Sequence, residues 1–589
     1  MPDQPRQTPV FDVRQFVPQP YADDSFFALI EQSAHLIIRE ADFPPPAGPG
    51  QRPHDPVMLS KLVLLMTRFG WTEREAARRT EFDLQVKACL GLGIDERGPS
   101  QPTIHRHRDR MKSLGLDTLY LDRLTKLLRR LDLIQRDEGL MADSTPVAGA
   151  GQVLDTFNLL AAGIRRGLRA LAKVRCMSSV ELASELGLER YLARSVKGSF
   201  DADWTQPAER CAVLETLVED AERLREAAAE GTTEGPDEPD DEPDGSAPMA
   251  NTPSDASPRR PRGKPKARAE LRIALALIVD TLDCDVQRDA KGRVTGVRQR
   301  AAGGRPISAT DPDMRHGRKS ASVLIAGYKA HLLASTRHDF IVEVAVTAAN
   351  VHDHQPLARL VTGARRRGQR PPWVAADRAY GTLRNHTDFA ADGRTELVAH
   401  AIRSTNGGRF TVDDFTIDLD ARTAACPRGE VTDGRWARRQ DLRGWSFTFA
   451  ADTCDGCPLR PQCTRAGEGK GRNLFVVPET HRLVQARLAR QGEPEFVERM
   501  RWRPGIERVI AGFAQCGGKQ AQRFGLEDVT FDARLSALAY NLRRLAALAA
   551  SDAALRARLE ALLRLVLVIL VSWLRARLSR SVVPGGRCR

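Results

Sequence analysis

The sequence has no leading apolar segment of the kind that directs export, and no apolar run long enough to cross a membrane. Its first twenty residues are polar, rich in proline and carry charges of both signs. The most apolar stretch, LVLVILVSWL at 565–574, falls well short of the roughly 20 residues that a membrane-spanning helix needs. We therefore expect a cytoplasmic protein with no membrane partner, in which residues 565–574 form a buried or packing helix.

Cysteine is clustered rather than spread in evenly spaced pairs. Of the 10 Cys in 589 residues, four lie in ACPRG and CDGCPLRPQC, namely Cys426, Cys454, Cys457 and Cys463. A chain without an export signal keeps its thiols reduced, so metal binding is favoured over disulfides. The spacing is close to that of zinc ribbons, although the upstream gap is long. It predicts one structural Zn²⁺ within 401–475, and a reduced, metal-free loop is the alternative.

The surplus of positive charge is moderate. Lys and Arg number 89 against 76 Asp and Glu, which gives a formal net charge of +13 and a pI near 9.5. A polyanionic partner is compatible with this surplus, and solubility alone also accounts for it. The chain is too long for one core, so we expect three or four domains.

Apolar residues recur at helical spacing from position 56 onward and predict an all-helical module. Within it, PTIHRHRDRMKSLG predicts a helix that presents Arg106, Arg108 and Arg110. Such a basic helix could enter a DNA groove. A solvated cationic face on an ordinary bundle explains the pattern equally well.

The pattern changes to strands later in the chain. From position 320, alternating apolar residues predict an antiparallel hairpin, followed by a helix, the buried strand WVAA, a second helix and a further strand. With the strand before Asp143, these elements predict an α/β fold in which helices flank a mixed sheet. The expected segments are an N-terminal extension at 1–55, a helical DNA-binding domain at 56–135, the first core strand at 136–152, a helical insertion at 153–228, a disordered linker at 229–270, the core at 271–400, the Cys-rich insert at 401–475, a helical part of the core at 476–550, and a C-terminal helix and tail at 551–589.

Acids follow two of the predicted strands. Asp143 comes after the apolar residues of GLMADST, and Asp377 comes after WVAA. Sheets of this kind gather ligands at strand ends, so the two carboxylates are predicted to share a metal, and a solvated loop carboxylate is the alternative for each. Oxygen donors suit Mg²⁺ (or Mn²⁺). Glu507 borders the apolar stripe of a later helix and could be a third ligand, whereas an exposed ion pair with Arg503 is the alternative.

Together these stretches resemble the DDE transposases of bacterial insertion sequences. The resemblance covers most of 56–546 and rests on PVMLSKLVLLMTRFGWTEREAAR, PTIHRHRDRM, ADST, TDPDMRHGRKS, GYKAHL, VTAANVHD, AADRAYGT, RPGIE and RFGLEDVTFDARLSALAYNLRRL, in the family's order. It implies a ribonuclease-H-like core in which Asp143, Asp377 and Glu507 form the catalytic metal triad. Similar Cys-rich inserts occur in a subgroup of these transposases between the second Asp and the Glu.

The resemblance also implies an activity and its partners. A protein of this family binds the terminal repeats of its element, cuts there with two Mg²⁺ ions and joins the freed 3′-hydroxyls to target DNA, as a homodimer in the synaptic complex. It would be nucleoid-associated when bound to DNA. A repurposed DNA-binding protein without turnover, and a related nuclease that cleaves without joining, are the alternatives.

One departure from the family concerns the basic residues near the third acid. Many members carry Tyr, Arg, Glu and Lys at positions where this chain has Met500, Arg503, Glu507 and Ala514. Other cations would then contact DNA phosphates in place of the missing Lys. The candidates, besides Arg503, are Lys519, Lys329 and Arg523, together with Arg315, Arg318 and Lys319 of the loop TDPDMRHGRKS.

Overall fold

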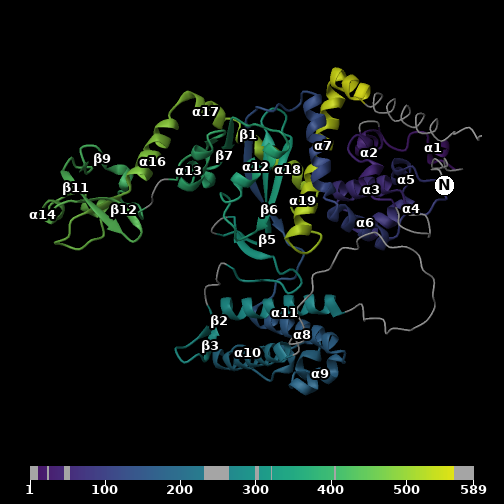
Figure 1. The fold of residues 1–589 in the computed structure, drawn as a ribbon, viewed down its shortest axis with the longest axis horizontal. Helices are drawn as coiled ribbons and strands as arrows, with labels where there is room; N and C mark the ends of the chain where they lie inside the picture. The colour runs from purple at the N-terminus through teal and green to yellow at the C-terminus, as the bar shows by residue number, and fades with distance from the viewer. Residues whose placement is uncertain are drawn as a thin grey trace, which may run out of the picture.

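The computed structural model describes residues 11–22, 25–45, 54–230, 264–298, 304–319, 322–402 and 406–562. Figure 1 shows an elongated molecule with N-terminal helices at one end, a helix-covered sheet in the middle and a smaller sheet at the other end. A separate helical bundle lies below the middle part in that view. The apolar run 565–574 and most of the expected linker, 231–263, lie outside the described residues.

The N-terminal domain is helical. Its helices are α1 Val13–Phe16, α2 Phe26–Ser33, α3 Pro56–Phe69, α4 Glu73–Phe82, α5 Leu84–Leu90, α6 Gln101–Ser113 and α7 Leu116–Arg130. Asp55 caps α3, Pro56 suits its first turn, and Gly70 ends it at φ 70°. Ile30 and Ile38 are buried in the same core as α3, so the stretch expected to be a separate N-terminal extension belongs to this domain.

A mixed sheet forms the centre of the molecule. Its strands are β1 Leu140–Ala148, β4 Arg315–Arg318, β5 Leu324–Ser335, β6 Ile341–Ala348, β7 Trp373–Ala376 and β8 Glu396–Val398. They lie in the order β4–β5–β1–β7–β8, with β6 paired to the remainder of β5. Only β5 runs against the other strands. This arrangement confirms the predicted mixed α/β class and is consistent with a ribonuclease-H-like core.

Helices cover both faces of the central sheet. Alternate side chains of β1 point to opposite faces, because a strand has a period of two. Leu140 and Ala142 pack with α12 Leu357–Arg366 and with the N-terminal domain. On the opposite face Met141 packs with α18 Gly505–Ala514. The long helix α19 Leu526–Ser551 contributes side chains to both cores and so connects the sheet with the N-terminal domain.

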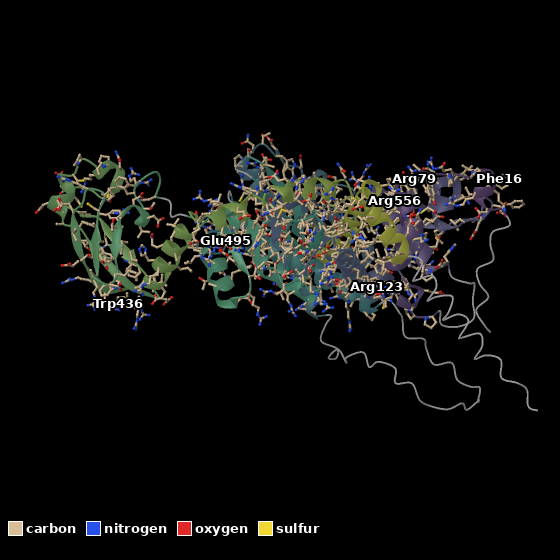
Figure 2. All side chains as sticks on the ribbon, turned by 90° about the horizontal axis from the view of Figure 1, so that it is seen from above. Phe16, Arg79, Arg123, Trp436, Glu495 and Arg556 are labelled. Atoms are coloured by element: carbon tan, nitrogen blue, oxygen red, sulfur yellow. The ribbon has the colours of Figure 1, made fainter. Side chains whose placement is uncertain are left out.

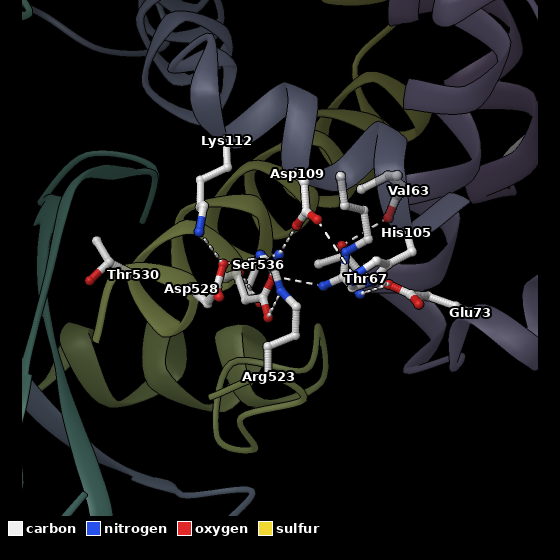
Figure 3. Close-up of polar contacts among 12 residues, drawn as sticks. Val63, Thr67, Glu73, His105, Asp109, Lys112, Arg523, Asp528, Thr530 and Ser536 are labelled. Carbon is white, nitrogen blue, oxygen red and sulfur yellow. Dashed lines mark hydrogen bonds and ion pairs between the residues drawn. The ribbon is translucent and has the colours of Figure 1, made fainter. Parts of the chain in front are cut away.

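Ion pairs reinforce the contact between α6 and the α19 region. Arg108 contacts Asp532 of α19 at 2.7 Å and Glu73 of α4 at 3.2 Å. Lys112 contacts Asp528 at 2.8 Å, and Arg523 contacts Asp532 at 3.0 Å. Figure 3 shows Lys112, Asp528 and Arg523 of this contact. The basic side of α6 is therefore partly neutralised by acids more than four hundred positions later in the chain.

The segment between β1 and β4 forms the separate bundle below the sheet in Figure 1. It contains α8 Thr156–Arg175, α9 Ser179–Leu186, α10 Pro207–Glu230, α11 Lys264–Asp285 and the hairpin β2 Val286–Arg288 with β3 Val294–Val297. The bundle has a hydrophobic core of its own. Residues 264–270, expected in the disordered linker, are helical, so the insertion extends past the predicted boundary at residue 228.

A second, antiparallel sheet carries the four clustered cysteines. Its order is β13–β12–β11–β10–β9, from strands β9 Thr416–Asp418, β10 Thr423–Ala425, β11 Val431–Arg439, β12 Leu442–Thr448 and β13 Asn473–Val476. We call residues 406–476 the Cys lobe. Helices α16 Pro478–Arg490 and α17 Pro494–Met500 lead from it back to the central sheet. Within the described ranges, no helix has the length and apolar character needed to cross a membrane.

Candidate active site

Asp143 and Asp377 lie next to each other on two parallel strands. Ala142 of β1 is in register with Ala376 of β7, so the two acids follow at equivalent positions. The prediction that Asp143 ends its strand is wrong in detail, because β1 continues to Ala148 along β5. Asp143 instead marks the point where the ladder with β7 ends.

The Asp143 carboxylate lies in a partly dry environment. Its side chain is 15% exposed, and it accepts hydrogen bonds from the Ser144 backbone N–H at 2.7 Å and from Arg503 at 2.9 Å. Burial raises the pKa of Asp143 to about 6, and the neighbouring acids Asp377 and Asp353 raise it further, whereas its two donors lower it. A nearby cation would favour the ionised form of this carboxylate.

Asp377 caps a short turn at the end of β7. Its Oδ1 accepts a hydrogen bond from the Ala379 backbone N–H at 2.9 Å. The buried run from Val374 to Ala376 holds the strand between β1 and β8, which fixes where this carboxylate emerges. The capping bond occupies one carboxylate oxygen and leaves the second available to a ligand.

Glu507 is connected to Asp143 through Arg503. It lies in the first turn of α18, and Ile506 and Val509 of that helix are buried against the Asp143 face of the sheet. Arg503 contacts Glu507 at 3.3 Å and Asp143 at 2.9 Å. The ion pair of Glu507 with Arg503, which was the alternative to a role as metal ligand, is thus present. Glu507 remains 69% exposed, so its carboxylate can turn toward a ligand.

Two residues that sequence reasoning passed over adjoin the acids. Tyr380 is fully buried beside them, and burial together with Asp143, Asp353 and Asp377 holds the pKa of its phenol well above the usual range. Asp353 pairs with Lys329 of β5 at 2.8 Å. Both stand in stretches that carry the family resemblance, AADRAYGT and VTAANVHD. Their position within these shared stretches is the sequence signal that could have identified both residues.

The donor set fits a hard divalent cation. The carboxylates of Asp143, Asp377 and Glu507 are oxygen donors of the kind that Mg²⁺ prefers, and Mg²⁺ needs only a few protein oxygens because it keeps several waters. In the described part of the chain, however, no group of three or more His, Cys, Asp or Glu side chains stands in an arrangement that could hold a metal ion. Arg503 occupies the place between Asp143 and Glu507 instead.

The four clustered cysteines line one small cavity of the Cys lobe. Its volume is about 30 Å³, roughly that of one water molecule. The backbone N–H of Arg472 donates to Cys454 Sγ at 3.4 Å. Burial raises the pKa of Cys463 and the three other thiols raise it further, which shows that they lie close together. Four thiols are the donor set of a structural Zn²⁺, but among the described residues they do not stand in an arrangement that could hold a metal ion.

The predicted DNA contacts fall into two groups. Arg106, Arg110, Arg318, Lys319 and Lys519 are exposed. Arg108 and Arg523 are 7% and 10% exposed and are held by acids of the α6–α19 interface. Lys329 is 10% exposed and paired with Asp353, and Arg315 donates to the Met314 carbonyl. The second group is thus less exposed and held within the protein, whereas Arg106 and Arg110 are exposed and donate to the Pro102 and Pro44 carbonyls.

The loop TDPDMRHGRKS also has a role inside the protein. Asp311 is buried and accepts hydrogen bonds from the Tyr328 hydroxyl at 2.5 Å and from the Gly525 N–H at 3.2 Å. Asp313 accepts one from the Leu526 N–H at 2.8 Å. The two acids therefore satisfy backbone donors at the start of α19.

Comparisons with known proteins agree with these observations. Residues 11–110 match the family model of a transposase domain (DUF772), and residues 425–546 match that of a transposase DDE domain. The second match includes Glu507 and all four cysteines of the Cys lobe. Searches of curated proteins and of solved structures give no significant match. The two family matches are consistent with a DDE transposase of the insertion-sequence type.

Proposed function

We propose that the protein binds the terminal repeats of its insertion sequence and catalyses Mg²⁺-dependent DNA cleavage and strand transfer. The observation that carries this proposal is the alignment of Asp143 and Asp377 on adjacent parallel strands, with Glu507 on the helix that covers the same face. The family matches imply DNA as the partner. The synaptic complex would be a homodimer, and the protein would act in the cytoplasm at the nucleoid.

Asp143, Asp377 and Glu507 would hold the divalent ions. When bound, a pair of such ions lowers the pKa of the attacking water or 3′-hydroxyl and neutralises the leaving oxygen. The desolvation that raises the pKa of Asp143 to about 6 makes a cation partner favourable there. At neutral pH this carboxylate is mostly ionised, as a ligand must be.

Arg503 would have two positions. Without a cation it bridges Asp143 and Glu507 and so offsets the repulsion between neighbouring acids. With the acids engaged elsewhere, its guanidinium becomes available to a DNA phosphate, which it can bind in bidentate fashion. The residue therefore stabilises the empty site and can hold the substrate in the loaded one.

The exposed cations give the salt-sensitive part of DNA binding. Arg106 and Arg110 on α6, Lys319 after β4 and Lys519 near the end of β1 are exposed. Each phosphate contact of this kind releases counterions, so affinity falls as salt rises. In the Cys lobe, we propose one Zn²⁺ held by the four thiolates, with a purely structural role.

The test replaces Asp377 by Asn in the full-length protein. DNA bearing the inverted repeats that flank the gene is incubated with Mg²⁺, and cleavage is followed together with joining from precut ends. Asp377→Asn should reduce cleavage by about 10²–10⁴-fold, because several kcal/mol of transition-state stabilisation are lost. Binding to the repeats should stay almost unchanged.

The matched control is Asp388→Asn, which changes an exposed acid of α13 Leu383–Asp392 that pairs only with Arg384. It should leave cleavage and joining intact. Full cleavage by Asp377→Asn would refute the site assignment. Cleavage without any joined product would make the protein a nuclease rather than a transposase.

A further inference from the structure

The hairpin formed by β11 and β12 extends beyond the small core of the Cys lobe. Its strands pair from Gly434 opposite Phe447 to Arg439 opposite Leu442, and Gln440 turns the chain at φ 52°. Phe447 is buried, whereas the residues from Arg438 to Arg443 are all exposed. The lobe stands at the far end of the molecule from the N-terminal helices (Figures 1 and 2), and Trp436 lies on its rim.

Four exposed arginines gather near the tip of this hairpin. Arg438 and Arg443 are directly opposite each other across the two strands, and Arg435 and Arg439 lie on the other face. Like charges directly opposite are destabilising in a sheet. Asp441 approaches Arg438 at 3.9 Å, and Arg438 also donates to the Gln440 carbonyl at 3.0 Å. Arg439 donates to Asn473 and lies over the Phe475 ring. Arg435 and Arg443 make no hydrogen bond or ion pair with any described residue, so these two charges of the cluster are not engaged within the lobe.

An aromatic side chain lies among these arginines. Trp436 is 55% exposed and meets Trp445 edge-on, with ring centroids 5.0 Å apart and planes at 73°. Leu442 is 57% exposed beside the turn. Large apolar side chains exposed within a basic cluster are typical of surfaces that bind nucleic acid or protein. The cluster of Arg435, Trp436, Arg438, Arg439 and Arg443 is called the hairpin cluster below.

We propose that the hairpin cluster is a DNA-binding surface that holds duplex DNA away from the acids. A two-stranded ribbon fits the major groove, which is about 12 Å wide. Arginines on both faces of the ribbon can then reach phosphates on both walls of the groove, and Trp436 packs against the sugars. The choice of DNA as the partner rests on the proposed function. The cluster itself is independent of the catalytic residues.

The experiment measures binding of the full-length protein to a 30-base-pair duplex over a range of salt concentrations. Replacing Arg438 and Arg443 by Ala should lower the slope of log affinity against log salt by about 1.8, since each phosphate contact contributes roughly 0.9. Trp436→Ala should weaken binding about tenfold with the slope unchanged, because it removes apolar contact and no charge. Arg384→Ala, an exposed arginine of α13, is the matched control and should change neither.

Thermal unfolding and zinc content of each variant establish that the lobe is folded. A second double variant, Arg435→Ala with Arg439→Ala, tests the arginines on the other face of the hairpin in the same assay. An unchanged slope in both double variants would overturn the proposal. So would losses confined to single-stranded DNA, because the duplex assignment would then be wrong.

The two proposals can fail separately. Asp377→Asn should keep the wild-type salt slope while losing cleavage. If the wild-type protein shows no Mg²⁺-dependent cleavage but the hairpin variants still lower the slope, the proposed catalytic function fails and the hairpin surface stands.

Discussion

The central sheet and the sheet of the Cys lobe are stabilised in different ways. The central sheet is covered on both faces, and from Tyr328 to Ser335 every residue of β5 is buried. In the sheet of the Cys lobe, β11 has no buried residue. Among the described residues, the buried hydrophobic core of the lobe consists of Phe415, Ala424, Phe447, Phe449, Leu474 and Val476. The comparison teaches that the candidate acids stand where packing already fixes the backbone, whereas the small core of the lobe fits the proposed Zn²⁺ cross-link.

The largest expected effect concerns the proposed Zn²⁺ of the Cys lobe. Replacing Cys454 and Cys457 by Ser should reduce zinc from about one ion per chain to almost none and unfold the lobe. Structural zinc contributes about 10–16 kcal/mol in zinc-finger peptides, far more than a core of six side chains can supply. Limited proteolysis should then cut within 406–476 and leave 54–230 and 322–402 protected.

Cys211→Ser is the control for this experiment, because that thiol lies in the helical bundle and donates to the Val294 carbonyl. Equal zinc content and equal proteolysis in the double variant would show that the lobe is stable without metal, and the contrast between the two sheets would disappear.

The second largest effect concerns a buried ion pair at the central sheet. Arg367 is 5% exposed and contacts Glu343 of β6 and Asp122 of α7. Arg367→Met leaves the Glu343 carboxylate buried without its partner, which should cost about 3–5 kcal/mol in free energy of unfolding. Urea unfolding of the core measures this loss.

Adding Glu343→Gln should recover part of that stability, because it removes the uncompensated charge. The zinc content should not change in either variant. A double variant as unstable as the single one would mean that Arg367 acts through packing rather than through its charge.

Asp143 and Asp377 can be picked out from the sequence because each follows a local apolar run. A buried apolar run that stops at an acid is visible in WVAAD, and the parallel pairing of β1 with β7 follows from the α/β pattern. The third acid needed the family resemblance, since an exposed ion pair explained Glu507 equally well. The sequence could therefore name candidate residues, but not the contacts that Arg503 makes with Asp143 and Glu507.

Contacts between residues far apart in the sequence could not be predicted in the same way. The run from His105 to Arg110 has the composition of a DNA-binding helix, but Arg108 is buried against Asp532. No local pattern shows which acids of a distant helix will face a basic side chain. The same reason explains the wrong boundary at 264–270, where α11 completes a core shared with α8 and α10.

Acidic pH should lower the free energy of unfolding of the protein outside the Cys lobe, by a smaller amount per histidine than the loss of Arg367. Burial lowers the pKa of His107, His331 and His386 to about 4, below the value of about 6.5 in an unfolded chain. Protons thus bind the unfolded state first, and stability that is complete above pH 6.5 is lost as the pH falls toward 4. The melting temperature should drop accordingly, by an amount equivalent to about 1–3 kcal/mol per histidine.

His107→Gln should flatten this pH dependence, and His105→Gln, an exposed histidine of the same helix, should not. The Cys lobe contains no histidine, so this cause of acid sensitivity is confined to the rest of the molecule. Parallel curves for wild type and His107→Gln would show that the buried ring does not take up a proton on unfolding.

The smallest expected effect concerns Asp441 of the Cys lobe, whose substitution should change DNA affinity but not stability. Asp441 is fully exposed and approaches Arg438 at 3.9 Å, a geometry in which an ion pair contributes almost nothing. Asp441→Asn should leave the melting temperature unchanged, but it removes the acid nearest the hairpin cluster and should raise duplex affinity about twofold at low salt. Asp388→Asn on α13 should alter neither quantity. If Asp441→Asn weakens binding instead, the arginines at the tip do not face DNA, because no surface that attracts phosphates should lose affinity when a negative charge beside it is removed.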